Sequence, residues 1–362
     1  MGDPGGRVVV AMSGGVDSSV AAALLVDDGY DVVGVSMQLY DQERGDARFG
    51  TCCTIDDLHD ARRVAAALGI PHYIVNLERR FEDVVVDNFV REYAAGRTPL
   101  PCAHCNSELK FSTLAEQALG FEATHVATGH YARVTREAGG RFRLWRGADP
   151  RKDQAYFLFG LTQAQLARVL FPVGDRTKDA VRQIAQARGL AVADKPDSQE
   201  ICFVPDGDYA AVVDRLLPAD RSGLIVDVAG RVVGRHDGVH HFTIGQRKRL
   251  GLASAAPLYV VRLDAGRQLV TVGPRAAVDA TGCTASGVNW IAGEAPGGLV
   301  RAEAQIRHRH AASAATIEPI ADGRVTIAFD APQTAVTPGQ AVVFYRGDEV
   351  LGGGWIDSPP PA

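Results

Sequence analysis

The chain has 362 residues, of which 46% are hydrophobic and 22% charged, with a formal net charge of −5 at pH 7. These values predict two or three folded domains. They also exclude a general polyanion binder, so contact with a nucleic acid requires local basic patches. No apolar run reaches the length of a membrane span, and the first residues, MGDPGGR, lack the pattern of a signal peptide. We therefore expect no membrane contact and a cytoplasmic location.

The first motif stands between a strand pattern and a helix pattern. Residues 8–11 read VVVA, which is typical of a strand buried in a parallel sheet, and residues 16–25 are rich in Ala and Leu. Glycines in the turn between them would let a phosphate reach the backbone N–H groups at the helix N-terminus. The lysine of the common ATP loop, G-x-x-x-x-G-K-[ST], is missing, since no lysine occurs among residues 1–100. A strand-turn-helix without nucleotide remains an alternative.

The later patterns continue the alternation of strands and helices. We predict strands at 32–39, 73–77 and 125–128, a hairpin over 133–146, and helices at 56–68, 162–170 and 177–188. This order favours a doubly wound α/β parallel sheet, with the ligand at the carboxyl ends of its strands.

From residue 223 onward the sequence alternates as strands do, with glycine turns and clear strands at 325–329 and 341–345. We therefore expect an α/β domain over residues 1–206, a small β-rich central domain over 207–274, and a C-terminal β-barrel that contacts nucleic acid over 275–362.

Six cysteines are too few for a secreted disulfide framework in a chain of this size. Three of them lie in two unusual segments, GRTPLPCAHCNSELKF at 96–111 and KPDSQEICFVPDGDY at 195–209. Catalytic thiols and buried reduced cysteines are two interpretations. A third is a zinc or iron–sulfur site made of Cys102, His104, Cys105 and Cys202, although the second ligand pair of a structural zinc site is missing.

Several spaced motifs carry a family resemblance. The stretch SGGVDSS at 13–19 resembles the signature of the ATP pyrophosphatase superfamily. The combination of that stretch with six others resembles the tRNA-specific 2-thiouridylase family over nearly the whole chain. The others are GRTPxPCxxCN, TGHYAR at 128–133, KDQxYFL at 152–158, KPDSQEICF at 195–203 and, further on, GQRKRLGL at 245–252 with GQAVVFY at 339–345.

The resemblance implies an ATP-dependent sulfurtransferase. Such an enzyme adenylates the oxygen on carbon 2 of the wobble uridine in tRNA, and persulfide sulfur then displaces AMP to give 2-thiouridine. It implies tRNAs for Lys, Glu and Gln as substrates, and a cysteine desulfurase or a sulfur-relay protein as the sulfur donor.

The resemblance also assigns residues to sites. Cys202 matches the persulfide carrier and Cys105 the second catalytic cysteine, and both thiols are expected to be reactive. Asp17 would help to hold the Mg2+ ion that bridges the phosphates. The implied ATP contacts are Ala11, Met12, Ser13, Gly14, Gly15, Val16, Asp17, Ser18, Met37 and Gly129. The implied tRNA contacts are His130, Lys152, Asp153, Gln154 and Gln340.

Two positions depart from the family pattern. Cys102 stands where many members have an aspartate, whose role therefore cannot be carried over, and Leu100 stands where asparagine is common. Since these segments hold three thiols, a disulfide between Cys102 and Cys105 is a further alternative.

Two basic runs could contact phosphates or be ordinary exposed faces. Their members are Arg235, His236, Arg247, Lys248, Arg249, Arg307 and Arg309. Two other functions stay open. One is a ligase of the same superfamily, which would have no use for paired thiols, and the other is a non-catalytic, zinc-dependent RNA-binding protein.

Overall fold

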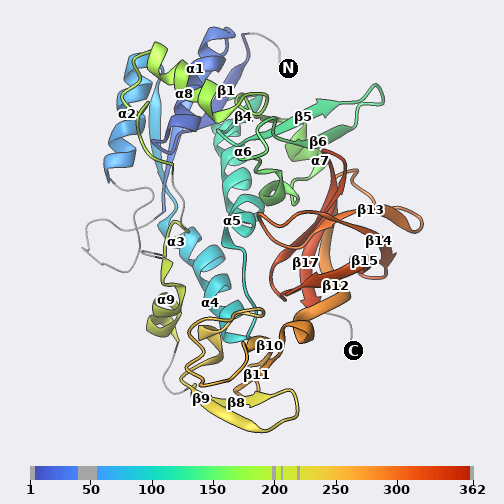
Figure 1. Cartoon of the computed structure of the whole chain (residues 1–362). Coiled ribbons are helices and arrows are strands. Elements are labelled where there is room, and N and C mark those ends of the chain that lie inside the picture. The colour runs from blue at the N-terminus through green and yellow to red at the C-terminus, as the bar shows by residue number, and fades with distance from the viewer. Residues whose placement is uncertain (1–4, 40–54, 198–200, 205–206, 218–220, 359–362) are drawn as a thin grey trace.

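A computed structural model describes residues 5–39, 55–197, 201–204, 207–217 and 221–358; Cys52 and Cys53 lie outside these ranges. Figure 1 shows an N-terminal part of helices and parallel strands, a small sheet at the opposite end of the molecule, and a barrel beside the helices that run between them. No helix within the described ranges combines the length and the apolar character needed to cross a bilayer.

The N-terminal part is built on a five-stranded parallel sheet in the order β3-β2-β1-β4-β7. Its strands are β1 (Arg7–Ala11), β2 (Asp31–Gln38), β3 (His72–Asn76), β4 (His125–Ala127) and β7 (Val169–Leu170). The chain moves outward from β1 in one direction through β2 and β3, and in the other through β4 and β7. The switch point therefore lies between β1 and β4, where ligands bind in sheets of this kind.

Helices cover both faces of this sheet because the residues of β1 are buried on both sides. Val8 and Val10 pack with α1 (Val16–Asp27), α2 (Ile55–Leu68) and α8 (Lys178–Ala187), whereas Val9 packs on the other face with α6 (Phe111–Gly120). The helix predicted over 177–188 is confirmed as α8, and Thr177 caps it, since its side chain accepts a hydrogen bond from the N–H of Ala180.

The helix predicted for residues 162–170 is wrong after its first turn. Thr162 does cap α7 (Gln163–Leu166) in a capping box, but the chain then extends as β7. Pairing of Val169 with Val126 of β4 supplies the backbone hydrogen bonds that a longer helix would have made.

A long helical stretch between β3 and β4 was not predicted. Its segments are α3 (Glu78–Phe81), η1 (Glu82–Val86), α4 (Asp87–Ala94), α5 (Pro101–His104), η2 (Cys105–Lys110) and α6. The two segments labelled η1 and η2 are π-helical, a conformation that is rare and often occurs at functional sites.

The central part begins with α9 (Tyr209–Leu216), which was also not predicted. Four strands follow in the order β10-β11-β8-β9, namely β8 (Gly223–Asp227), β9 (Val232–His236), β10 (Tyr259–Asp264) and β11 (Leu269–Gly273). Two short 3-10 turns, η5 (Val239–His241) and η6 (Arg275–Val278), lie outside the sheet.

The C-terminal part is a closed barrel, as predicted. Six strands follow one another around it in the order β12-β15-β14-β13-β16-β17, and β17 pairs again with β12. Their bounds are β12 (Asp279–Trp290), β13 (Val300–Gln305), β14 (Ser313–Ile320), β15 (Arg324–Thr334), β16 (Ala341–Arg346) and β17 (Glu349–Ser358).

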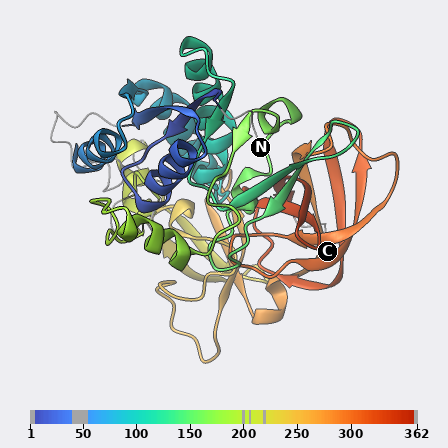
Figure 2. The same cartoon turned by 90° about the horizontal axis from the view of Figure 1, so that it is seen from above.

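A hairpin of the N-terminal part joins this barrel. The predicted hairpin is formed by β5 (Ala132–Arg136) and β6 (Phe142–Arg146), and β6 pairs with β17. Figure 2 shows the hairpin extending beside the barrel strands. The guanidinium of Arg146 lies 3.7 Å from the ring centroid of Tyr345 in β16, which adds a cation–π contact between the two parts.

Candidate active site

The loop between β1 and α1 has the shape of an anion site. Gly14 has a φ of +72°, and a Cβ at this position would collide with the carbonyl oxygen of Asp57, so only glycine fits. Gly15 is the N-cap of α1 and provides no side-chain cap for the first N–H groups of the helix. Ser18 Oγ instead accepts a hydrogen bond from the N–H of Ser13 at 3.2 Å, which closes the loop. The loop therefore presents N–H groups and the positive end of a helix dipole.

Asp17 lies in the first turn of α1 and is held from two sides. The Tyr131 hydroxyl donates to its Oδ1 at 2.8 Å, and Lys178 Nζ contacts Oδ1 at 2.7 Å and Oδ2 at 2.9 Å. Burial and the nearby Asp17 raise the pKa of Tyr131, so its phenol stays protonated and donates. A carboxylate offers about four lone-pair sites, so these bonds leave one, on Oδ2. Asp17 thus fits a cation bound through one oxygen.

Distant segments supply the lysines that the loop itself lacks. Lys178, the first residue of α8, is only 5% exposed. Lys195 Nζ donates to the carbonyl of Gly14 at 3.0 Å and pairs with Asp57 and Asp60 of α2 at 2.6 and 2.5 Å. The sequence reasoning missed both lysines because they lie 161 and 181 positions beyond their partners Asp17 and Gly14. The available signal was Lys195 at the start of the KPDSQEICF motif.

Asp197 links Lys178 to a residue implied in tRNA binding. Its carboxylate contacts Lys178 at 2.7 Å, Arg182 at 2.9 Å and Lys152 at 2.5 Å. Burial by itself would raise the pKa of Asp197, but the hydrogen bonds from Lys152 and Lys178 outweigh it and lower this pKa to about 2. Asp197 is therefore ionised at neutral pH.

The segment after β4 forms the other wall of the loop. A Cβ on Gly129 would lie 2.6 Å from the backbone nitrogen of Ser18, so the two segments are in close contact. His130 shares a hydrogen bond of 2.8 Å with Thr128 through Nδ1, and burial lowers the pKa of His130 so that its ring is neutral. Since Met37 lies near the end of β2, the ten residues implied in ATP binding gather at the carboxyl ends of β1, β2 and β4.

Cys102 and Cys105 lie one turn apart at the start of the helical stretch α5-η2-α6. Pro101 occupies the first turn of α5, Cys102 is exposed, and Cys105 is partly buried as the first residue of η2. Cys105 carries a free thiol, so no disulfide joins it to Cys102 in this structure. The neighbouring Asn106 donates to the carbonyl of Phe157 at 3.2 Å.

The ionisation of Cys105 differs from the expectation of a reactive thiolate. Burial raises the pKa of the Cys105 thiol, and the positive charge of Lys110 offsets only part of this effect. Cys105 is therefore a protonated thiol at neutral pH in the protein without ligands.

Cys202 and Cys105 both pack against one apolar cluster, to which α4 and α9 contribute residues. Phe203 anchors the turn that carries Cys202, since its ring centroid lies 5.0 Å from that of Phe89 and 5.6 Å from that of Phe81. Both cysteines pack against this cluster, whose buried members are Phe81, Val85, Val86, Phe89, Tyr93, Leu109, Phe203, Val204, Val212 and Val213. The two cysteines that the sequence paired thus border the same apolar cluster.

We expect the buried thiol of Cys105 to be alkylated more slowly by iodoacetamide at pH 7.5 than the exposed thiol of Cys102. The rate at Cys105 should continue to rise with pH beyond the ordinary thiol pKa of about 8.5, where the rate at an unshifted thiol levels off. Peptide mass spectrometry of one sample reports both rates. A faster reaction at Cys105 than at Cys102 near neutral pH would contradict the raised pKa.

The residues implied in tRNA binding lie in two places. Lys152 and Gln154 are in the α/β part near the nucleotide loop, and Gln340 is in the barrel part. Lys152 is partly exposed beside the nucleotide loop, and Gln340 Nε2 donates to the carbonyls of Thr98 and Pro99 at 3.0 and 3.3 Å. Gln340 thus connects the barrel to the segment that leads into Cys102 and Cys105. Gln154 accepts a hydrogen bond from the N–H of Tyr131 at 2.9 Å and so fixes the turn after His130.

Asp153, implied in tRNA binding, and His236, a member of the first basic run, are both largely buried. The Asp153 side chain is 7% exposed, and its oxygens accept from Arg146 and from the N–H groups of Gly147 and Ala155. These bonds hold the carboxylate against the turn that follows β6, and a contact of Asp153 with tRNA stays a prediction. His236 is 6% exposed and faces the carbonyl of Gln268 at 3.2 Å, so this member of the run offers neither an exposed face nor a phosphate contact in this structure. Arg235, Arg247, Lys248 and Arg249 are exposed.

Among the described residues, one group of side chains has the spacing of metal ligands: Asp214, His240 and His241. His240 Nε2 lies 2.6 Å from Asp214, while its buried Nδ1 has no acceptor. A metal-bound histidine normally donates its other N–H, so we interpret this contact as a hydrogen bond that joins α9 to η5. Cys102, His104, Cys105 and Cys202 do not form such a group, which argues against the alternative of a zinc site.

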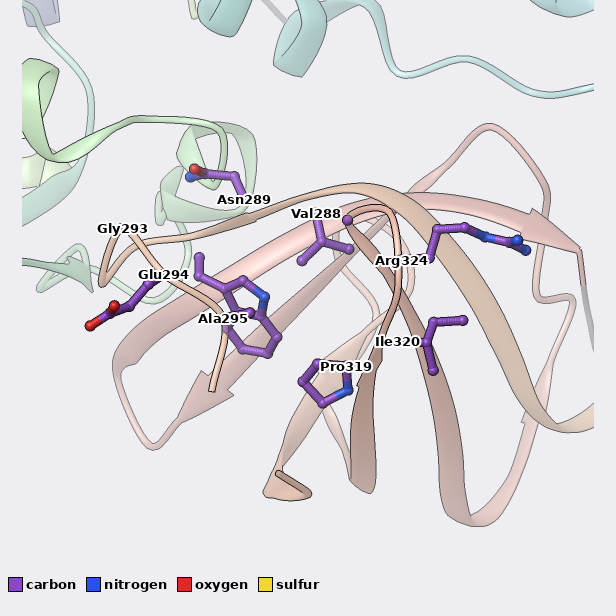
Figure 3. A pocket seen from close by; sticks show the side chains of 10 residues that line it. Val288, Asn289, Gly293, Glu294, Ala295, Pro319, Ile320 and Arg324 are labelled. Carbon is purple, nitrogen blue, oxygen red and sulfur yellow. The ribbon is translucent and has the colours of Figure 1, made fainter. Parts of the chain in front are cut away.

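A cavity of about 240 Å³ lies in the barrel, between residues of β12 and the turn from β14 to β15. Figure 3 shows its lining, including Asn289, Glu294, Pro319 and Arg324. None of the residues that the sequence implicates lines it, so it is not the candidate site.

Family models match three parts of the chain in turn. They are described as tRNA methyl transferase HUP domain, residues 6–206, tRNA methyl transferase PRC-barrel domain, residues 210–274, and Aminomethyltransferase beta-barrel domain, residues 280–356. Together these matches extend over nearly all the described residues.

Curated relatives match the chain from end to end. The chain is 54% identical over 360 residues to the tRNA-specific 2-thiouridylase MnmA of Geotalea uraniireducens, which covers 97% of this chain and 95% of that protein. It is also 54% identical over 366 residues to the protein of the same name from Solibacter usitatus, with coverage of 97% and 99%. Because identity above one half extends over almost the whole of both chains, this protein belongs to the tRNA-specific 2-thiouridylase family.

Proposed function

We propose that this protein uses ATP to replace oxygen by sulfur at carbon 2 of the wobble uridine in tRNA. The observation that supports this most is the combination in one α/β unit of a glycine loop shaped for phosphates and two cysteines on one apolar cluster. A ligase that joins an amine to an activated carbonyl would use the loop but not the cysteines.

Activation would occur at the carboxyl ends of β1 and β4. The oxygen on carbon 2 of uridine attacks the α-phosphorus of ATP, pyrophosphate leaves, and the uridine carries AMP on that oxygen. The first N–H groups of α1 and the serines of the loop would bind the phosphates. A Mg2+ ion held by the remaining lone pair of Asp17 would neutralise phosphate charge.

The two cysteines would then deliver sulfur. A donor protein, either a cysteine desulfurase or a sulfur-relay protein, loads Cys202 as a persulfide. The terminal sulfur attacks carbon 2 and AMP departs with the original oxygen. The Cys105 sulfur loses its proton and attacks Sγ of Cys202, which forms a disulfide and leaves sulfur on the uridine. Two external thiols must reduce this disulfide before the next cycle.

The tRNA would lie across the junction of the three parts. Lys152 and His130 are beside the nucleotide loop, Gln340 connects the barrel to the cysteine segment, and Arg247 and Lys248 are exposed on the central part. We propose the tRNAs for Lys, Glu and Gln as substrates, and the cytoplasm as the location.

Formation of AMP and pyrophosphate from ATP tests this proposal. We expect both products to appear in equal amounts only when the purified protein receives a persulfide donor together with tRNA that has an unmodified wobble uridine, since the uridine oxygen attacks ATP and sulfur then displaces AMP. A matched transcript with cytidine at that position is the control. AMP formation that is equal with the control transcript, or that needs ammonia or an amino acid, would favour the ligase instead.

A further inference from the structure

The ammonium of Lys178 is placed where the phosphates of a nucleotide would bind. It lies 2.7 Å from Asp17 in the first turn of α1 and 2.7 Å from Asp197, and its contacts with Asp17 Oδ1, Asp17 Oδ2 and Asp197 use all three N–H groups. We propose that Lys178 binds the phosphates of the nucleotide and that Asp197 holds its ammonium while the site is empty. This proposal rests on the use of ATP proposed above.

The charge balance around Lys178 favours an additional anion. Five side chains contact one another in this network, namely Asp17, Asp197, Lys178, Lys152 and Arg182. Two are negative and three are positive, so these ion pairs carry a net charge of +1; the neighbouring carboxylate of Asp149 is itself paired with Arg151. The network lies at the N-terminus of α1, where the helix dipole adds positive potential. A bound phosphate would compensate both the positive charge of the network and the positive potential of the helix dipole.

Lys178 is fixed at its backbone and adaptable at its end. Its N–H donates to Asp149 Oδ2 at 3.0 Å, and Asp149 is only 2% exposed, so the start of α8 is anchored. The four-carbon stem of a lysine can still turn its ammonium from one acceptor to another. A phosphate on the loop would therefore compete with Asp197 for the same ammonium.

A purely structural ion pair would have different consequences. Val181 and Ala185 of α8 are fully buried in the apolar core that α8 shares with α1, so packing of the helix does not depend on Lys178. If Lys178 and Asp197 only stabilised the fold, loss of either side chain would weaken the binding of every ligand. Competition instead predicts opposite effects on phosphate binding, because loss of Asp197 would release the ammonium.

Calorimetric titration of the full chain with magnesium pyrophosphate, AMP and α,β-methylene ATP distinguishes these cases. We expect Lys178→Met to lower the affinity for pyrophosphate and for the ATP analogue by about tenfold or more. Its affinity for AMP should fall by about twofold at most. Asp197→Asn should strengthen pyrophosphate binding about threefold, and the double variant should lose that gain. Arg188→Met is the matched control, since Arg188 lies at the other end of α8 and pairs with Asp27 rather than with Asp17 or Asp197; its pyrophosphate affinity should change by less than about 1.5-fold.

Three results would overturn the proposal. They are unchanged pyrophosphate affinity in Lys178→Met, equal losses for AMP and pyrophosphate, and weaker pyrophosphate binding in Asp197→Asn. If Lys178→Met is unstable in thermal unfolding, Asp197→Asn alone decides by the sign of its effect. A wild-type protein that binds neither the ATP analogue nor pyrophosphate would refute the proposed function itself, whereas normal wild-type binding with any of the three results refutes only the role of Lys178.

Discussion

Asp17→Asn is expected to reduce tRNA-dependent AMP formation about a thousandfold while tRNA affinity changes by about twofold at most. The variant keeps the shape of the side chain but removes the charge that Lys178 and a magnesium ion would share. Loss of a metal-bound carboxylate at a phosphate is expected to cost several kcal/mol of transition-state stabilisation. AMP release from labelled ATP in the presence of tRNA and a persulfide donor measures the first quantity, and filter binding of tRNA measures the second.

Asp27→Asn is the matched control for this prediction. Asp27 is the last residue of α1, pairs with Arg188 and is far along the helix from the loop. The control should retain normal AMP formation. Undiminished AMP formation in Asp17→Asn would contradict the role of Asp17. Equal loss of AMP formation and tRNA binding would instead point to a folding defect, which thermal unfolding detects.

The two cysteine variants are expected to stop the reaction at different steps. Cys202→Ser should still adenylate tRNA but accept no radiosulfur from a cysteine desulfurase, because the persulfide carrier is lost. Cys105→Ser should accept the label on Cys202 and fail to pass it to tRNA, because no second thiol releases it. Thiolated tRNA should fall below detection in both, as measured by its retardation on a mercury-containing gel.

Cys102→Ser is the control for this series, since Cys102 is one turn from Cys105 but is exposed. We expect it to retain substantial thiolation, because the proposed chemistry needs two thiols. Loss of activity in Cys102→Ser together with activity in Cys105→Ser would show that the two cysteines must exchange roles. Release of bound metal from either variant would support the metal alternative.

Local patterns predicted the parts of the fold whose contacts are local or whose burial is complete. The valines of β1 indicated a buried parallel strand, and Thr177 indicated the start of α8. The alternation in residues 325–329 indicated a barrel strand. In each case the signal lies within a few residues of the feature that it specifies.

Features that depend on distant partners were not predictable in this way. β7 is a strand because β4 leaves an open edge next to it, not because of its own pattern. The two lysines that contact the loop are Lys178 and Lys195, and no local motif connects them to Asp17 and Gly14. The burial of Asp153 depends on Arg146, which lies outside its motif, and that of His236 depends on Gln268, which is distant in sequence. Neither burial could therefore be predicted from the local pattern.

The route of one oxygen atom tests the central claim most directly. A tRNA that carries oxygen-18 on carbon 2 of the wobble uridine can be incubated with the protein, ATP and a persulfide donor, and the products analysed by mass spectrometry. The proposed chemistry predicts that the oxygen-18 lost from the uridine appears in the phosphate of AMP, one atom for each 2-thiouridine formed. Formation of 2-thiouridine with unlabelled AMP would contradict adenylation of the uridine oxygen.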